Sequence, residues 1–256
     1  MIRQDLILFA AAVVGGTLNA VAGGGSFFTF PALLLARVPA IPANATSTVA
    51  LWPGSVASVA AYRREVGRAP HLIPLSAASV VGGAVGAELL LHTPAGLFSA
   101  MVPYLLLGAT ALFAVGGVAA RWVRRLQEQR SRQAGPRARG PLGLAGAQLV
   151  IAAYGGFFGG GIGILMLSAL RLAGLDDMHT MNAVKTLQAA LINGVAVAIF
   201  IIAGKVFWPQ ALVMVVGAVL GGYGGAAGAR HVDPRLIRAL VIVVGCAMSA
   251  YFFWRG

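Results

Sequence analysis

Two glycine triplets occupy corresponding places in the two halves of the chain. The first, residues 23–25, lies in an apolar stretch from Leu6 to Ala36, and the second, residues 159–161, lies in an apolar stretch from Leu142 to Leu172. Each glycine disfavours a helix by about 1 kcal/mol relative to alanine, so both stretches are predicted to be broken helices. A duplicated break within apolar segments is the best sequence indication of a transport site.

Broken helices leave backbone N–H groups free, and these groups can bind an anion. The short helices after the triplets are expected to start near Ser26 and Ile162. A helix N-terminus carries about half a positive charge, and glycine lets an anion come close to the backbone. Two such ends facing each other would form an anion site without a cationic side chain. The alternative is that the glycines only permit tight packing or a kink, but their duplication favours a site.

Polar side chains follow each triplet at matched spacing, as Asn44-Ala-x-x-Thr48 and Asn182-Ala-x-x-Thr186. At the start of an element, Asn and Thr cap a helix. They can also contact a ligand, because both roles occur where N–H groups are free. Asn19 precedes the first triplet by one helical turn and could pair with broken backbone or touch the substrate.

One lysine, Lys185, lies inside a predicted span. A charge at membrane depth is costly and usually marks function, but Lys185 is about one turn into its span and could instead extend to the interface. Its counterpart in the first half is Ser47. Gln188 and Asn193 lie on or near the face of Lys185. Glu88 is the only acid inside a span; it could relay a proton, but its place near a helix end favours an interfacial or paired role.

The predicted substrate-binding residues are Asn19, Gly23, Gly24, Gly25, Ser26, Asn44, Thr48, Gly159, Gly160, Gly161, Ile162, Asn182, Lys185, Thr186 and Gln188. No metal site or cofactor is predicted, because Cys246 is the only cysteine and the four histidines lack ligand spacing. No catalytic arrangement is recognisable either, so an enzyme is not expected.

The composition predicts an integral membrane protein. Hydrophobic residues make up 59% of the chain and charged residues 10%, against about 25% charged residues in soluble domains. The net charge of +12 comes mostly from short loops between apolar runs. That placement is typical of retention on the cytoplasmic side and of contact with anionic lipid, and it argues against nucleic-acid binding.

We predict an all-α fold with two homologous repeats in a single membrane domain, residues 1–256. Repeat one covers residues 6–122 and repeat two covers residues 142–254; between them, residues 123–141 carry six arginines and are predicted to be a flexible, basic, cytoplasmic linker. Each repeat contains one broken segment and three transmembrane helices. The expected spans are Thr46–Tyr62, Leu72–Leu91, Ala95–Ala120, Thr180–Ala203, Ala211–Ala229 and Leu236–Trp254. Residues 6–22 imitate a signal peptide but are expected to stay in the fold, because their counterpart is internal.

The path of the broken segments is left open by the charges. As a continuous helix, Leu6–Ala36 would be about 46 Å long, more than the hydrocarbon core of about 30 Å. If the segments cross, the repeats are parallel and Lys and Arg divide thirteen to five between the two sides; if they are re-entrant, the repeats are inverted and the division is fourteen to four. Both versions place the linker and Arg63, Arg64 and Arg68 in the cytoplasm. The short arms favour the re-entrant, inverted version.

These motifs resemble the TauE/SafE sulfite exporter family of membrane transporters. The resemblance rests on Gly15–Pro31, Asn44–Thr48, Gly155–Gly163 and Asn182–Thr186, with further matches at the glycine pairs 82–83 and 221–222. It covers nearly the whole chain. It implies export of sulfite, sulfoacetate or a related organosulfonate across the bacterial inner membrane. The residues by themselves lead only as far as a small anion.

The leading hypothesis is a secondary transporter, in the role of an exporter, that binds a small anion and works by alternating access around the two broken helices. The alternative is a passive anion channel, because the same helix ends could line a pore. A coupling proton or cation and a homo-oligomer are both left open. Cation transport is disfavoured by the scarcity of carboxylates inside the spans.

Overall fold

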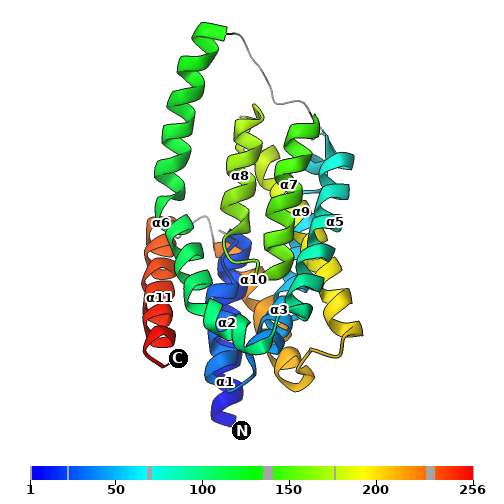
Figure 1. Cartoon of the computed structure of the whole chain (residues 1–256), viewed down its shortest axis with the longest axis vertical. Helices are drawn as coiled ribbons and strands as arrows, with labels where there is room; N and C mark the ends of the chain where they lie inside the picture. The colour runs from blue at the N-terminus through cyan, green and yellow to red at the C-terminus, as the bar shows by residue number, and fades with distance from the viewer. Residues whose placement is uncertain are drawn as a thin grey trace.

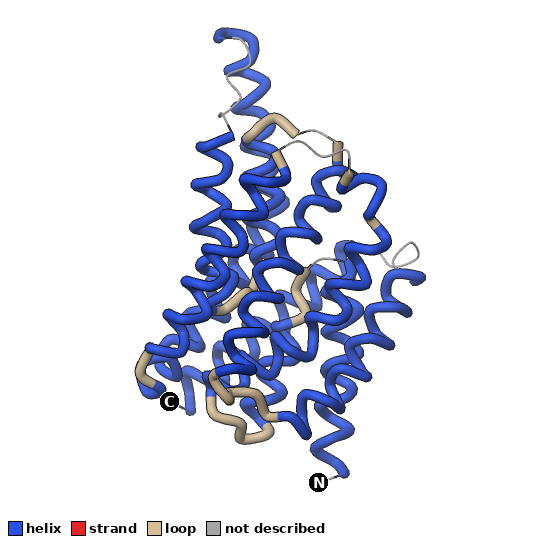
Figure 2. Tube along the Cα trace, turned by 90° about the vertical axis from the view of Figure 1, so that its right-hand side faces the viewer, coloured by secondary structure: helices blue, strands red, loops and turns tan. Residues whose placement is uncertain are grey.

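The chain folds into a bundle of helices (Figures 1 and 2). The computed structural model describes residues 2–255 except 22, 68–70, 135–140, 176 and 229–233, and it describes only the backbone of residues 2, 20–21, 61, 116–134, 141–142, 225–228, 234–238 and 255. The helices are α1 (Ile2–Val21), α2 (Ser26–Leu35), α3 (Ala40–Ala61), α4 (Arg63–Val66), α5 (Leu72–His92), α6 (Ala95–Ala134), α7 (Pro141–Phe157), α8 (Ile162–Leu172), α9 (Met178–Ile202), α10 (Trp208–Gly228) and α11 (Pro234–Arg255). No strand occurs among the described residues, which confirms the all-α prediction.

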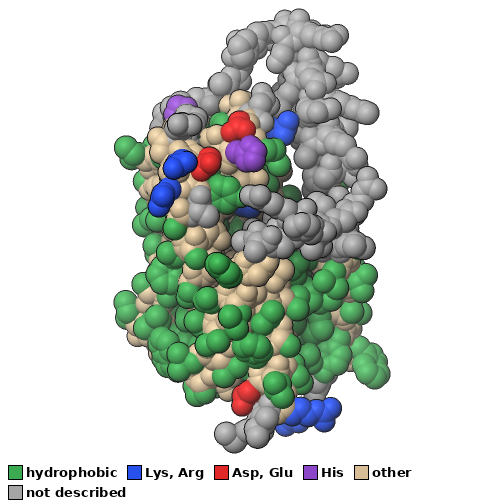
Figure 3. Space-filling view, turned by 180° about the vertical axis from the view of Figure 1, so that it is seen from behind, with side chains coloured by type: hydrophobic (Ala, Val, Ile, Leu, Met, Phe, Trp, Pro, Cys, Tyr) green, Lys and Arg blue, Asp and Glu red, His purple; other side chains and the backbone are tan. Residues whose placement is uncertain are grey.

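The apolar character of the bundle agrees with a multi-pass membrane protein. Within the described residues, three helices are long and apolar enough to cross a bilayer: Leu72–His92, Ala95–Val115 and Met178–Ile202. On the face seen in Figure 3, charged side chains lie near both ends, the histidines lie towards the upper end, and much of the described surface between the ends is hydrophobic. A belt of this kind suits the hydrocarbon core, with the charges in the interfacial regions.

The first broken segment folds back on itself. Helices α1 and α2 are joined through Gly23, whose φ of +76° suits glycine. At the other end of the pair, the side-chain amide of Gln4 donates a hydrogen bond of 3.0 Å to the carbonyl of Ala36. The start of α1 and the end of α2 therefore lie at the same end of the molecule. We call α1–α2 the first hairpin.

The second broken segment, α7–α8, is joined through residues 158–161 and forms the second hairpin. Gly159 and Gly161 adopt φ values of +81° and +79° at its turn. In Figure 1 the chain N-terminus lies at the bottom, whereas the outer ends of α7 and α8 lie towards the top. Short loops half-way along the bundle are visible in Figure 2.

Each hairpin packs mainly against a helix from the other half of the chain. Helix α1 lies along α10 and helix α7 lies along α5, while α3 packs on α9 and α6 packs on α11. Glycines allow the close approach: a Cβ added to Gly82 would meet the carbonyl oxygen of Leu149, and one added to Gly221 would meet that of Val13. Small residues at these two positions let the paired helices approach closely.

Two helix boundaries differ from the sequence prediction. Helix α3 starts at Ala40, six residues before the expected Thr46, because Pro39 and Ala40 are compatible with a helix start. Helix α6 continues to Ala134, well into the segment that we predicted to be flexible. Arginine, glutamine, glutamate and leucine are good helix formers, so this basic segment can extend a helix that is already nucleated.

Candidate functional site

The tips of the two hairpins meet inside the bundle. A Cβ added to Gly23 in the first tip would lie 3.9 Å from the Cα of Gly163 in the second. Beside this contact, the rings of Phe30 and Phe158 pack edge to face with centroids 5.7 Å apart. Edge-to-face packing favours one relative orientation of the two rings, so it helps to hold the tips together.

A cavity of about 50 Å³ lies between the hairpin tips and helices α3 and α9. A buried water needs about 10–15 Å³ on this measure, so the cavity has room for a few waters or a small oxyanion. Its lining residues are Asn19, Gly23, Ser26, Thr48, Leu51, Ser55, Ser58, Phe158, Gly159, Ile162, Gly163, Lys185, Thr186, Ala189 and Asn193. Both halves of the chain contribute similar elements, because each supplies one tip and one long helix.

Eight of the predicted residues line this cavity: Asn19, Gly23, Ser26, Thr48, Gly159, Ile162, Lys185 and Thr186. Ser26 and Ile162 are the first residues of α2 and α8, and neither helix start has a hydrogen bond from a capping side chain. The first residues of both short helices therefore line one shared cavity.

The remaining triplet glycines build the turns and do not line the cavity. A Cβ on Gly24 would meet the ring of Phe113, and one on Gly25 would lie 2.5 Å from the carbonyl oxygen of Gly15. In the second tip, the carbonyl of Gly160 accepts a 2.7 Å hydrogen bond from the Tyr154 hydroxyl. A side chain at Gly24, Gly25 or Gly160 would meet an aromatic ring or the backbone, whereas Gly161 has room for one but adopts a left-handed backbone with φ of +79°.

The asparagines Asn44 and Asn182 do not start their helices. Asn44 lies inside α3, and its side-chain amide donates a 3.1 Å hydrogen bond to the carbonyl of Phe157, the last residue of α7. It thereby satisfies a carbonyl left free by the break in the second hairpin. Asn182 lies inside α9, and α9 is capped by Asp177 instead.

The Asp177 carboxylate accepts hydrogen bonds from the side chain and the backbone N–H of Thr180, the latter at 2.9 Å. These bonds, with a weaker contribution from the backbone of His179, lower the pKa of Asp177 below its ordinary value. The carboxylate also lies at the positive end of the α9 dipole. The expected capping role thus belongs to a residue outside the predicted set.

Lys185 is buried in the cavity wall, with only 8% of its surface exposed. No ion pair to it is found in the part of the chain that the structure describes, and no carboxylate is among the lining residues. An uncompensated buried charge is costly, so the site suits a ligand of opposite charge. Its counterpart Ser47 is also buried, but it forms a 2.6 Å hydrogen bond with Thr29.

Gln188 is buried but lies outside the cavity lining. Its amide donates a 3.3 Å hydrogen bond to the hydroxyl of Ser76 on α5, and its Oε1 has no partner among the described residues. Sharing a face with Lys185 was not enough to bring it to the cavity, because α9 packs on α5 as well as on α3.

Several cavity residues were missed by the sequence analysis: Leu51, Ser55, Ser58, Phe158, Gly163 and Ala189. Asn193 was recognised only as lying near the face of Lys185. The repeat itself could have found Ser55, because Ser55 stands as far beyond Asn44 as Asn193 stands beyond Asn182. Its hydroxyl accepts a 3.1 Å hydrogen bond from the Asn19 amide.

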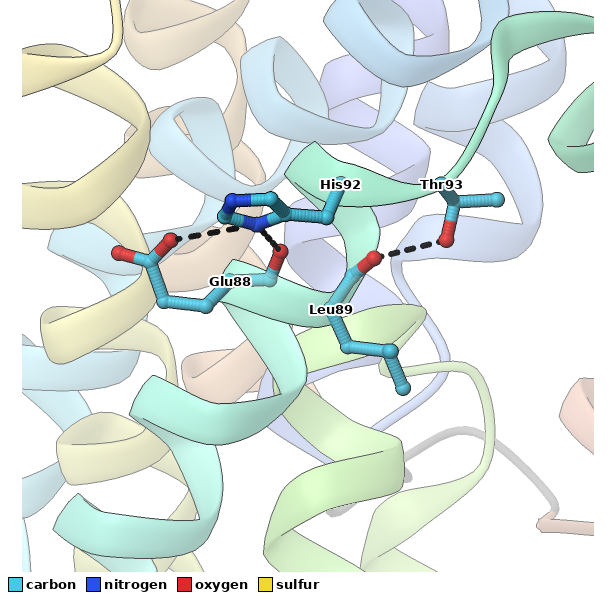
Figure 4. A network of polar contacts seen from close by, with 4 residues as sticks. All are labelled: Glu88, Leu89, His92 and Thr93. Atoms are coloured by element: carbon cyan, nitrogen blue, oxygen red, sulfur yellow. Dashed lines mark hydrogen bonds and ion pairs between the residues drawn. The ribbon is translucent and has the colours of Figure 1, made fainter.

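Glu88 lies away from the cavity, near the end of α5. Its side chain is 53% exposed, and its carboxylate lies 3.7 Å from Nδ1 of His92 one turn later (Figure 4). The nearby Thr93 hydroxyl donates to the carbonyl of Leu89. Of the two roles left open for Glu88, this position agrees with the interfacial or paired one.

The chain was compared with known proteins. The family model described as "Sulfite exporter TauE/SafE" matches residues 8–252, nearly the whole chain. The chain belongs to the TauE/SafE family. Relatives include the "Probable membrane transporter protein ORF9" of Sinorhizobium sp, 28% identical over 249 residues, which cover 94% of this chain and 89% of that protein. Another is the "Probable membrane transporter protein YfcA" of Escherichia coli K12, 29% identical over 95% of this chain and 87% of YfcA.

A third relative is the "Probable membrane transporter protein" of Haemophilus influenzae, 27% identical over 95% of this chain and 92% of that protein. No solved structure matches the chain. These names place the chain in a family of membrane transporters, in agreement with the resemblance found from the glycine and asparagine motifs.

Proposed function

We propose that this protein is a secondary transporter that binds a small anion in the cavity between the two hairpin tips. The observation that carries the proposal is Lys185, a buried cation without a counter-ion among the described residues, in a cavity where two helices begin. None of the described residues that line the cavity is acidic. An ammonium group and two helix N-termini together favour a negative ligand.

The arrangement of the hairpins supports inverted repeats with re-entrant segments. The Gln4–Ala36 hydrogen bond brings both outer ends of the first hairpin to one end of the molecule. The packing of α1 on α10 is matched by that of α7 on α5, which is what a two-fold relation between the repeats requires. In alternating access, each hairpin and the helix it lies on would open the cavity to one side.

We propose that the upper end in Figure 1 faces the cytoplasm of a bacterial inner membrane. The end of the long helix α6, which leads into the basic linker, lies there. The short helix α4, which carries Arg63 and Arg64, comes shortly before α5 in the chain, and α5 starts at this upper end (Figure 1). Positive residues favour the cytoplasmic side.

The family description favours sulfite or a related sulfur-containing anion, such as sulfoacetate or another organosulfonate, as the exported substrate. The test is flux into liposomes that contain the purified full-length protein, with labelled sulfite and a panel of sulfonates. We expect saturable flux driven by a gradient. Absence of flux for the whole panel would contradict the proposal, and single-channel currents in a planar bilayer would favour the passive channel instead.

A further inference from the structure

The two long helices that line the cavity present different hydrogen-bonding groups. We call Thr48, Ser55 and Ser58 the α3 wall, and Lys185, Thr186 and Asn193 the α9 wall. All three members of the α3 wall are hydroxyl residues. The α9 wall instead carries an ammonium group, a hydroxyl and an amide.

The hydroxyls of the α3 wall use their protons within their own helix. Thr48 donates to the carbonyl of Asn44 at 2.9 Å, Ser58 to that of Gly54 at 2.9 Å, and Ser55 to that of Leu51 at 3.4 Å. Such bonds to the carbonyl four residues earlier are common for Ser and Thr in helices. A hydroxyl that donates in this way still has lone pairs to offer. Towards a ligand, the α3 wall therefore accepts hydrogen bonds.

Asn19 adds an acceptor beside this wall. One N–H of its side-chain amide donates to Ser55 at 3.1 Å, and the amide still has its Oδ1 oxygen, together with a second N–H, for a ligand. The α9 wall has the opposite character, because the Lys185 ammonium has three donors and no acceptor. No hydrogen bond of the Lys185 side chain is found within the described residues.

The hydroxyl residues of the α3 wall also extend over about three turns of the helix. Thr48 and Ser58 are ten residues apart on α3, a distance of about 15 Å along the helix. The second half has no matching extension, because the counterpart of Ser58 is Ala196, which is buried and outside the cavity lining. The cavity lining therefore extends further along α3 than along α9, and the added residue, Ser58, is a hydroxyl residue.

We propose that the α3 wall selects the substrate: the anion carries a hydroxyl or amino group, which donates to Ser55 and Ser58, while its anionic group binds Lys185. This rests on the proposed function, whose panel includes sulfite and sulfoacetate, and it narrows the substrate class to small sulfonates with a hydrogen-bond donor, ahead of anions that carry only acceptors. A ligand that brings only acceptors leaves the α3 wall unpaired and meets its oxygen lone pairs. Unpaired buried polar groups are a strong source of discrimination.

The experiment measures binding to the purified full-length protein by calorimetry, with three probes of similar length. Isethionate carries a hydroxyl, ethanesulfonate carries a methyl group in its place, and sulfoacetate carries a carboxylate, which is an acceptor at neutral pH. We expect isethionate to bind about tenfold more tightly than ethanesulfonate, the effect of one well-formed hydrogen bond, and sulfoacetate to bind more weakly than isethionate.

The variant Ser58→Ala should reduce the preference for isethionate over ethanesulfonate to within about threefold. Ser168→Ala is the matched control, because the Ser168 hydroxyl makes the same kind of bond, 2.8 Å to the carbonyl of Ile164, outside the cavity; it should keep the wild-type preference. If Ser58→Ala does not fold, binding of the three probes to the wild-type protein still tests whether the α3 wall selects ligands with a donor.

Equal binding of isethionate and ethanesulfonate, or tighter binding of sulfoacetate, would overturn the selective role of the α3 wall while leaving anion binding intact. Failure of all three probes, and of sulfite, to bind the folded protein would instead overturn the proposed function together with it.

Discussion

The two halves of the molecule share their architecture and differ in their chemistry. In each half a hairpin is followed by a long helix, α3 or α9, and the parts meet around one cavity. At corresponding positions, Ser47 is bonded to Thr29, whereas Lys185 has no ion-pair partner among the described residues. The two halves thus supply similar elements around the cavity, and Lys185 is a charged side chain that the first half does not match.

The hairpin turns differ in a second way. Gly25 precedes α2 in an ordinary helical conformation, with φ of −58°, but has the carbonyl of Gly15 close by. Gly161 precedes α8 with φ of +79° and has only ordinary contacts at 3.7 Å or more. Both positions need glycine, the first for space and the second for its backbone conformation.

The largest expected effect on anion affinity comes from removing the Lys185 side chain, which has Ser47 as its counterpart in the first half. Lys185→Ala should weaken the binding of sulfite or a sulfonate about 30-fold or more, because a buried charge partner is removed. Ser47→Ala should change affinity only slightly, since this hydroxyl is bonded to Thr29. Calorimetric titration of both variants measures the contrast.

Lys205→Ala is the control for Lys185→Ala, because Lys205 is exposed and is the only other lysine in the chain. The Lys205→Ala variant should bind sulfite or a sulfonate with the affinity of the wild-type protein. If Lys185→Ala folds and binds with unchanged affinity, the lysine has no part in anion binding.

A smaller effect is expected at the two turns. Gly25→Ala forces a methyl group against the Gly15 carbonyl and should destabilise the protein by about 1–3 kcal/mol. Gly161→Ala has room but requires a left-handed backbone, at about 1–2 kcal/mol. Gly161→Asn should be milder, because Asn tolerates that conformation. Thermal unfolding in detergent should therefore rank the Tm of Gly161→Asn above that of Gly161→Ala; the reverse order would show that space, not backbone conformation, matters at Gly161.

The smallest effect concerns the starts of α3 and α9. Asp177 caps α9, whereas Pro39 at the start of α3 provides no side-chain bond. Asp177→Ala should lower the Tm slightly at neutral pH. Because hydrogen bonds to the carboxylate lower the pKa of Asp177, its contribution is present above the unfolded-state value of about 3.9 and is lost as the pH falls through the folded-state pKa. A Tm difference between variant and wild type that persists at low pH would contradict this account.

Much of the fold could be predicted from the sequence. The expected spans correspond to α3, α5, α6, α9, α10 and α11, because long apolar runs bounded by charges or Pro have few alternatives in a bilayer. The predicted start of α3 at Thr46 was wrong, because residues 40–45 carry no strong signal that a helix starts or stops there. The helical extension of α6 was missed because arginine-rich segments with Pro and Gly also occur in linkers.

The site was only partly predictable. The triplets led to Gly23, Ser26, Gly159 and Ile162 because breaking a helix is a local property of the sequence. Gln188 was placed at the cavity by its spacing from Lys185, but neighbouring residues on a helix face can contact different partners. Ser58 gave no signal, because a single serine in an apolar helix has no spacing to recognise.

The sequence by itself determined a helical membrane protein with two matching halves, two broken helices and a small-anion site as the leading interpretation. These features follow from local composition, period and duplication. Only the tertiary structure decided that the first segment turns back beside Ala36 and that Lys185 faces the shared cavity. Both depend on which helix packs against which, and pairings such as α1 with α10 join residues that are far apart in the chain.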